Sequence, residues 1–190
     1  MKALQFFIEL EEMSPAVSRQ IAVPGNYTFY QLHKAIQAAF GWYNCHLFEF
    51  SKPGKIKSKT CYSIPDPEME IKCKDARNEL ITSVFKKPGQ EFLYVYDFGD
   101  WWVHKLTFEK ELPQEFSRPY CFAGKGACPP EDCGGPHGYN EMVDALTTPR
   151  HPAKKSFETW LGFAKGEKWK PDFCSLREVN ARLGLLATDL

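Results

Sequence analysis

The sequence predicts an α+β fold built on a mostly antiparallel sheet, with C-terminal helices packed on it. Strand-like patterns and one helix fill residues 1–111, whereas helical periodicity dominates residues 139–186. Strands grouped first and helices grouped last are typical of α+β domains. A strand hairpin, then a helix, then further strands is a β-grasp-like order. We therefore predict a single domain over residues 1–190, with an ordered Cys-, Pro- and Gly-rich loop at 112–138.

The first elements are a strand hairpin and a helix. Residues 3–10 carry apolar side chains at every second position, as half-buried strands do. Residues 16–23 predict a second strand that aligns Val17, Ile21 and Val23, with Arg19 on the same face near its edge. Thr28 with Gln31 three positions later forms the capping-box pattern that begins a helix. His33 lies off the apolar stripe of this helix, so we expect it to be exposed to solvent.

The aromatic stretch at residues 91–109, EFLYVYDFGDWWVHKLTFE, predicts a second hairpin. Residues 99–100 are Gly-Asp, which suits a two-residue type II′ turn with glycine first. With this turn, Asp97 and His104 fall on one apolar face beside Trp102 and lie within side-chain reach. We therefore expect His104 to be buried and hydrogen-bonded to Asp97.

Imidazole and carboxylate side chains are the first candidates for chemistry, because they bind transition metals and transfer protons. The catalytic candidates are His46, Asp97, His104 and Glu131, and the binding candidates are Asp100, Trp102, Asp132 and Tyr139. The alternative is structural: a carboxylate that satisfies a buried histidine, with Asp100 only a turn residue.

The segment from Cys128 to Tyr139 is expected to be ordered and to pack against the hairpin. Its three prolines restrict the unfolded chain, so ordering costs less entropy than for a general loop. The loop would then present Glu131 and Asp132 to His46 or His104. If the loop is only structural, the two carboxylates should instead accept hydrogen bonds from its own backbone.

The cysteines give a second, weaker candidate. Cys121, Cys128, Cys133 and His137 could together ligate zinc, but their spacing lacks the close Cys pair typical of zinc knuckles. Small buried thiols in a tight loop are the alternative. The chain has seven cysteines, an odd number, and its N-terminus does not resemble a secretion signal. We therefore expect reduced thiols, no disulfide and a cytoplasmic location.

The charge balance gives no global attraction to nucleic acid or to membrane surfaces. Lys and Arg number 24, as do Asp and Glu, and no apolar run is long enough to cross a bilayer. The lysines from Lys52 to Lys59 allow a local phosphate contact, although a solvated loop explains them as well. Three functions remain open: a binding or accessory domain of unknown partner, a metal-dependent hydrolase, and a nucleic-acid accessory protein.

Several motifs resemble one protein family over about residues 3–185. They are Phe40-Gly41-Trp42 with His46-Leu47, the run Tyr94–Asp100 followed by Trp102 and His104, and the run Ala127–Pro136 followed by Gly138-Tyr139. These are similar to the plasmid pRiA-type ORF-three-like family, also labelled TnpR-like passenger proteins of insertion elements. The resemblance implies an α+β domain whose activity is not established. Trp101 departs from it, because the family often has a second acidic residue there, and no serine-recombinase pattern is present.

Overall fold

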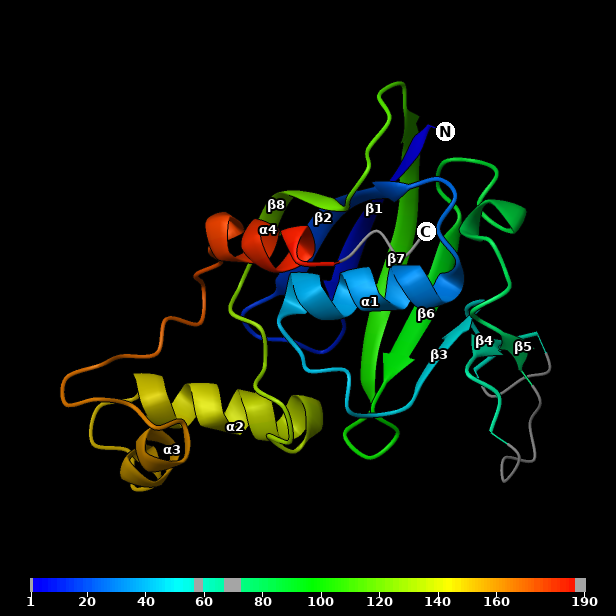
Figure 1. Cartoon of the computed structure of the whole chain (residues 1–190). Coiled ribbons are helices and arrows are strands. Elements are labelled where there is room, and N and C mark those ends of the chain that lie inside the picture. The colour runs from blue at the N-terminus through cyan, green and yellow to red at the C-terminus, as the bar shows by residue number, and fades with distance from the viewer. Residues whose placement is uncertain (1, 57–59, 67–72, 187–190) are drawn as a thin grey trace.

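The computed structural model describes residues 2–56, 60–66 and 73–186, and it contains an eight-stranded sheet with helices beside it (Figure 1). The strands are β1 (Ala3–Leu10), β2 (Val17–Pro24), β3 (Phe48–Ser51), β4 (Tyr62–Ser63), β5 (Lys74–Asp75), β6 (Glu91–Tyr96), β7 (Trp102–Leu112) and β8 (Tyr120–Lys125). The helices are α1 (Phe29–Phe40), α2 (Gly135–Thr147), α3 (Lys154–Trp160) and α4 (Leu176–Gly184), with a short 3-10 helix at Ile81–Ser83.

The strand order is β5-β4-β3-β6-β7-β1-β2-β8. The described pairings are antiparallel apart from β4 with β5, which run parallel. The α+β class with a mostly antiparallel sheet is therefore confirmed, whereas the β-grasp-like detail stays a prediction. Among the described helices, none has the length and apolar character needed to span a bilayer.

Helix α1 lies across one face of the sheet and begins as the sequence predicts (Figure 1). The Thr28 hydroxyl oxygen accepts a hydrogen bond from the Gln31 backbone amide, and Gln31 Oε1 accepts one from the Thr28 backbone amide. Phe29 packs against Phe50 of the sheet with ring centroids 5.3 Å apart. The amphipathic stripe of α1 thus closes the core over β3 and β6.

The central hairpin forms, but its predicted two-residue turn is wrong. Tyr96 pairs with Trp102 and Tyr94 with His104, so the connecting loop runs over residues 97–101. A shift of register by one residue moves a strand's side chains to the other face relative to its partner. Asp97 consequently leaves the sheet and does not share a face with His104.

The segment 112–138 is ordered, but it is not the structureless loop that its composition predicts. Strand β7 reaches Leu112, β8 pairs with β2 inside the segment, and α2 begins at Gly135 rather than at residue 139. In the edge strand β8 only Cys121 is buried, and the pairing with β2 shifts register once. Buried and exposed residues therefore do not alternate along β8. A strand of this kind carries little periodic signal.

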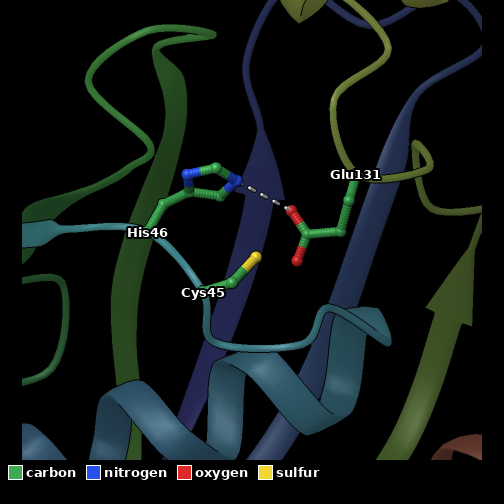
Figure 2. Close-up of side chains that lie close together, drawn as sticks. All are labelled: Cys45, His46 and Glu131. Atoms are coloured by element: carbon green, nitrogen blue, oxygen red, sulfur yellow. Dashed lines mark ion pairs between the residues drawn. The ribbon is translucent and has the colours of Figure 1, made fainter.

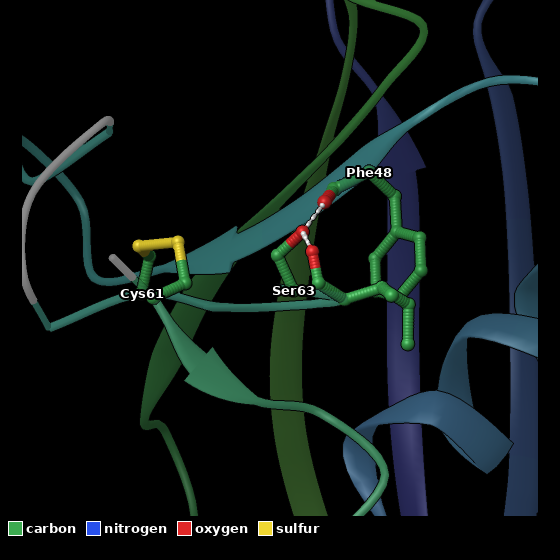
Figure 3. The surroundings of a disulfide bond; sticks show 5 residues. Phe48, Cys61 and Ser63 are labelled. Atoms are coloured by element: carbon green, nitrogen blue, oxygen red, sulfur yellow. Dashed lines mark hydrogen bonds between the residues drawn. A yellow bond between two sulfur atoms is a disulfide. The ribbon is translucent and has the colours of Figure 1, made fainter. Parts of the chain in front are cut away.

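A disulfide joins Cys61 to Cys73, so the expectation of no disulfide is wrong (Figure 3). The bonded cysteines stand just before β4 and β5, where Tyr62 pairs with Lys74. This parallel pairing brings the two Cα atoms to 4.7 Å, within the range that a disulfide requires. Sequence spacing could not reveal the pair, because the two strands are only two residues long.

The lysine loop after β3 is partly described. Lys52 and Lys55 are exposed, as a solvated loop would have them. Lys57 and Lys59 lie outside the described residues. A phosphate contact by this loop therefore stays a prediction.

Candidate metal-binding site

One imidazole nitrogen faces three carboxylates at one end of the sheet. His46 Nε2 lies 3.3 Å from Asp132 Oδ1, 3.6 Å from Asp97 Oδ2 and 3.9 Å from Glu131 Oε2. This nitrogen is buried, and it has no hydrogen-bond partner among the described residues. The structure therefore brings together four of the residues that the sequence singled out.

Three loops supply these groups. His46 stands on the loop between α1 and β3, Asp97 begins the loop between β6 and β7, and Glu131 and Asp132 belong to the loop between β8 and α2. Antiparallel pairing of β3 with β6 places the start of one beside the end of the other, and Asp97 donates its backbone amide to Leu47. The third loop reaches the same place although it is far away in the sequence.

Two of the carboxylates use one oxygen for structure and turn the other toward His46. Asp97 Oδ1 accepts from the Gly99 amide at 2.8 Å, which leaves Oδ2 for the imidazole. Glu131 Oε1 accepts from the Tyr43 amide at 2.8 Å and from the Tyr96 hydroxyl at 3.1 Å, which leaves Oε2. Hydrogen bonds of this kind orient the ligands of metal ions.

The backbone around the site is unusual. Asp97 and Asp132 both have φ 57°, and Asn44 has φ 56°. Asp and Asn are the non-glycine residues that best tolerate this left-handed region, since their short polar side chains bond locally. Residues held in sparsely populated conformations cluster at functional sites.

Cys45 and Tyr96 complete the surroundings, and sequence reasoning missed both. Figure 2 shows Cys45 and His46 side by side on one loop, facing Glu131. The Cys45 amide donates to the Tyr96 hydroxyl at 3.1 Å, and burial raises the Tyr96 pKa. The position of Cys45 directly before His46 in the sequence could have indicated Cys45 as a ligand. Nothing in the sequence distinguishes Tyr96 from an ordinary core residue.

A buried hydrogen-bond network holds the loop that carries His46. Gln37 Nε2 donates to the Tyr94 hydroxyl at 2.8 Å, and that hydroxyl lies 2.8 Å from His33 Nδ1. His33 Nε2 contacts Asn44 Oδ1, and the backbone amide of Asn44 donates to Gln37 Oε1. Because Asn44 Oδ1 can only accept, Nε2 of His33 carries the proton and Nδ1 accepts from Tyr94.

The expected exposure of His33 is therefore wrong. Its side chain is fully buried and stacks on Phe48 with centroids 3.8 Å apart. Burial lowers the His33 pKa to about 4, against the opposing hydrogen bond with Asn44. A neutral imidazole is needed here, since the network gives it one donor role and one acceptor role.

His104 stands apart from the three carboxylates. Its burial is as expected, but its Nδ1 donates to the Tyr94 carbonyl at 3.2 Å instead of to Asp97. Its ring meets Phe40 and Trp42 edge-on, with centroids 4.8 and 5.1 Å away. Burial lowers the His104 pKa to about 3. An uncharged core histidine accounts for all of these contacts.

The proposed binding residues other than Asp132 hold the fold together. Asp100 Oδ2 accepts from the Gly134 amide at 3.2 Å, which joins the hairpin loop to the start of α2. Trp102 is fully buried in the core. Tyr139 is buried as well, and its hydroxyl donates to the Ala127 carbonyl at 2.9 Å.

The proposed zinc thiols are not assembled. Among the described residues, no group of three potential ligand atoms within 4.8 Å of one another contains Cys121, Cys128, Cys133 or His137. Burial raises the pKa of the Cys121 thiol to about 11 and that of Cys133 to about 12, and it raises the Cys128 pKa further. His137 is exposed on α2. Cys121 is a small buried thiol in β8, and Cys128 and Cys133 are partly buried thiols in the loop between β8 and α2, as the structural alternative has them.

The spacing at His46 suits a metal ion. Ligand atoms about 2.1 Å from a tetrahedral ion lie about 3.4 Å from one another, and the three distances from His46 Nε2 bracket that value. Two overlapping groups of potential ligands share this histidine. One contains His46, Asp97 and Asp132, and the other contains Cys45, His46 and Glu131.

Comparison with known proteins places the chain in a family. The chain matches the plasmid pRiA4b ORF-3-like proteins over residues 2–178. The chain belongs to the plasmid pRiA4b ORF-3-like family. The resemblance found in the motifs is thereby confirmed.

Two proteins of similar sequence were found by comparison. The uncharacterized protein y4hQ of Sinorhizobium fredii (strain NBRC 101917 / NGR234) is 34% identical over 174 residues, which are 90% of this chain and 87% of that protein. A crystal structure of the protein of unknown function MM3350 from Methanosarcina mazei Go1 aligns with a TM-score of 0.78 at 32% identity. That alignment covers 93% of this chain and 97% of the other.

Proposed function

We propose that this protein is a metal-binding domain that holds a divalent transition metal ion at His46, Asp97 and Asp132. The observation that carries the proposal is the buried Nε2 of His46, which has no hydrogen bond within the described part of the chain and faces carboxylate oxygens at ligand spacing. Imidazole with carboxylates is a ligand set for zinc, manganese or iron. Hydrogen bonds hold the carboxylates of Asp97 and Glu131, so these two groups are oriented before the ion binds.

The alternative is an ion pair without metal, in which a protonated His46 sits among the carboxylates. An imidazolium supplies one positive charge, whereas Asp97, Glu131 and Asp132 supply three negative charges. Within the described residues, the ion pairs of these carboxylates are all with His46. A divalent ion offsets this repulsion better than a proton does, because like charges this close disfavour each other.

Metal-dependent hydrolysis is the second candidate function, and the uneven exposure of the site favours it. The side chains of Asp97 and Glu131 are 11% and 9% exposed, whereas that of Asp132 is 72% exposed. The site is thus closed on one side and open to solvent on the other, as catalytic metal sites are. Glu131 Oε2 faces the same histidine nitrogen and would accept a proton from a metal-bound water.

Metal titration of the purified chain tests the proposal. After removal of metal with a chelator, zinc and manganese are titrated into wild type and into Asp97→Asn, with calorimetry as the readout. Asparagine keeps the Oδ1 that accepts from Gly99 but removes the charge beside His46. We expect affinity to fall at least about 100-fold while the thermal midpoint changes little.

The matched control is Asp144→Asn. Asp144 Oδ2 lies 3.8 Å from His151 Nε2, so it also pairs with a histidine, but its side chain is exposed on the outer face of α2. Affinity should be unchanged in this variant. Cys45→Ser separates the two ligand groups: an unchanged zinc affinity supports Asp97 and Asp132, and a large loss assigns the ion to Cys45 and Glu131. Absence of stoichiometric metal binding in wild type would contradict the proposal.

Three broader expectations also stay proposals. They are a role as an accessory domain, the insertion-element passenger label and a cytoplasmic location. The Cys61–Cys73 disulfide bears on the last, because structural disulfides are rare in the reducing cytoplasm.

A further inference from the structure

A cavity of about 530 Å³ lies between the C-terminal end of α1, the loop at residues 127–130, and α4 with the segment that precedes it. In Figure 1 this segment is the orange trace that leads from α3 to α4. The volume of the cavity is in the range of small-molecule binding sites. The residues that line it differ from those around His46, so the cavity is separate from the candidate metal site.

Arg19 supplies a buried positive charge to the cavity. The residue is only 3% exposed. Its Nη1 donates to three backbone carbonyls, those of Ser18, Lys125 and Gly126, and its Nε donates to Ala39 at 3.1 Å. Each of these acceptors is a neutral carbonyl. A buried charge is costly unless an opposite charge accompanies it.

Arg182 brings a second guanidinium to the same place. Its Nε donates to the Ala38 carbonyl at 2.8 Å, next to the carbonyl that Arg19 uses. Gly41 makes room for it, since a Cβ there would lie 3.3 Å from the guanidinium carbon. The carbonyls at the end of α1 account for one nitrogen of each arginine. They do not explain why two cations gather at one wall of a cavity.

The lining of the cavity also includes aromatic surface and an indole donor. Trp169 lines the cavity, and its indole Nε1 is buried without a partner among the described residues. Phe163 stacks on Trp169 with ring centroids 6.4 Å apart. The guanidinium carbon of Arg19 lies over the Phe40 ring, 5.2 Å from its centroid. Buried indole N–H groups normally find an acceptor. A ligand in the cavity would need an acceptor atom for the Trp169 indole N–H and a flat or apolar body that packs on the aromatic rings.

We propose that this cavity binds a small organic anion that carries a phosphate or carboxylate group on an aromatic body. Arg19, Arg182, Lys168 and Lys170 line the cavity against two acidic residues, Glu167 and Glu178. The surplus of cations favours an anion, and guanidinium groups match the geometry of phosphate and carboxylate oxygens. The aromatic walls contact the body of the ligand, and Trp169 Nε1 donates to it.

Three probes test the proposal on the whole chain: phenyl phosphate, benzoate and phenol. Binding is followed by calorimetry and by the part of the tryptophan fluorescence that is lost in Trp169→Phe. At least one of the two anions should bind at least tenfold more tightly than phenol. The tighter of the two shows whether the site prefers phosphate or carboxylate. If neither anion binds, or if phenol binds equally well, the proposal fails.

Arg182→Gln should weaken binding of the preferred anion at least tenfold. The matched control is Arg118→Gln, because Arg118 also donates to a carbonyl at a helix end, that of Gly184, but it does not line the cavity. If Arg182→Gln unfolds the protein, Lys170→Gln replaces it, since Lys170 is exposed at the cavity. That variant should weaken binding about threefold. Unchanged affinity in a folded variant overturns the assignment.

Discussion

The hydroxyl group of Tyr96 donates a hydrogen bond to Oε1 of Glu131 at 3.1 Å, although 35 positions separate the two residues. The same hydroxyl accepts from the Cys45 amide, next to His46. One tyrosine at the end of β6 therefore joins the two loops that meet at the candidate metal site. Its contribution can be measured, because removal of a single oxygen atom leaves the ring in place.

Tyr96→Phe is expected to weaken zinc binding about tenfold, since groups that orient metal ligands contribute factors of this size. The loss of a buried hydrogen bond should lower the free energy of unfolding by about 1 kcal/mol. Calorimetric titration and urea unfolding measure the two effects. Tyr120→Phe serves as the control, because Tyr120 is 45% exposed on β8. Equal zinc affinity in wild type and Tyr96→Phe would separate Tyr96 from the site.

Stability should fall as the pH is lowered from 7 to 5. The pKa of His33 is about 4 and that of His104 about 3, both lowered by burial from 6.5. Between these values and 6.5 the unfolded chain binds more protons than the folded chain, so the stabilisation is present above pH 6.5 and is lost on acidification. Each histidine should account for about 2 kcal/mol of the loss by pH 5.

Urea unfolding at the two pH values measures this loss in wild type and in His33→Gln and His104→Gln. Each replacement should reduce the difference between pH 7 and pH 5, whatever it does to stability at pH 7. His137→Gln is the control, because His137 is exposed on α2. A pH difference that neither buried-site replacement changes would assign the acid sensitivity to other groups.

The disulfide sets the expected thiol count. Under denaturing, non-reducing conditions a thiol reagent should find five groups, those of Cys45, Cys121, Cys128, Cys133 and Cys174. After reduction it should find seven, the number of cysteines in the chain. Reduction should also lower the free energy of unfolding by about 3 kcal/mol, as expected for a loop of this length. Seven thiols before reduction would show that Cys61 and Cys73 are not bonded.

Gly135→Ala is expected to disturb the contact between the hairpin loop and α2. A Cβ at Gly135 would lie 2.5 Å from the Asp100 carbonyl oxygen. Gly162→Ala is the matched control, because both glycines have φ +69° and Gly162 has open space around it. Both variants incur the same backbone strain, so Gly135→Ala should be less stable by about 1 to 3 kcal/mol. Urea unfolding measures the difference. Equal stabilities of the two variants would show that the close approach of Gly135 to the Asp100 carbonyl does not limit the size of the side chain.

Local patterns predicted much of the fold. Strands β1 and β2, the capping box at Thr28 and Gln31, and the apolar stripe of α1 all appear in the structure, although both strands are buried at most positions rather than at every second one. These features depend on neighbours within a few residues, which the sequence displays directly. Strand β8 escaped prediction because it is an exposed edge strand, and the β4–β5 pair escaped because it is too short to show a period.

The candidate site was predicted in part. His46, Asp97, Glu131 and Asp132 were chosen for their chemistry, and the expected docking of the 128–139 loop brought the last two to His46. His104 was chosen through a hairpin register that is wrong by one residue. The length of the loop between β6 and β7 depends on the left-handed backbone conformation of Asp97 and on the hydrogen bond that Asp97 Oδ1 accepts from the Gly99 amide. A two-residue turn pattern in the sequence reveals neither feature.

The sequence by itself determined the fold class, the beginning of α1, the existence of the central hairpin and the chemical types available to a site. Only the tertiary structure decided which histidine meets the carboxylates and which one is buried among aromatic rings. It also decided that Arg19 and Arg182 meet at one cavity. The reason is physical: periodicity and capping are local, whereas the distance between two side chains depends on register and loop conformation summed over the whole chain.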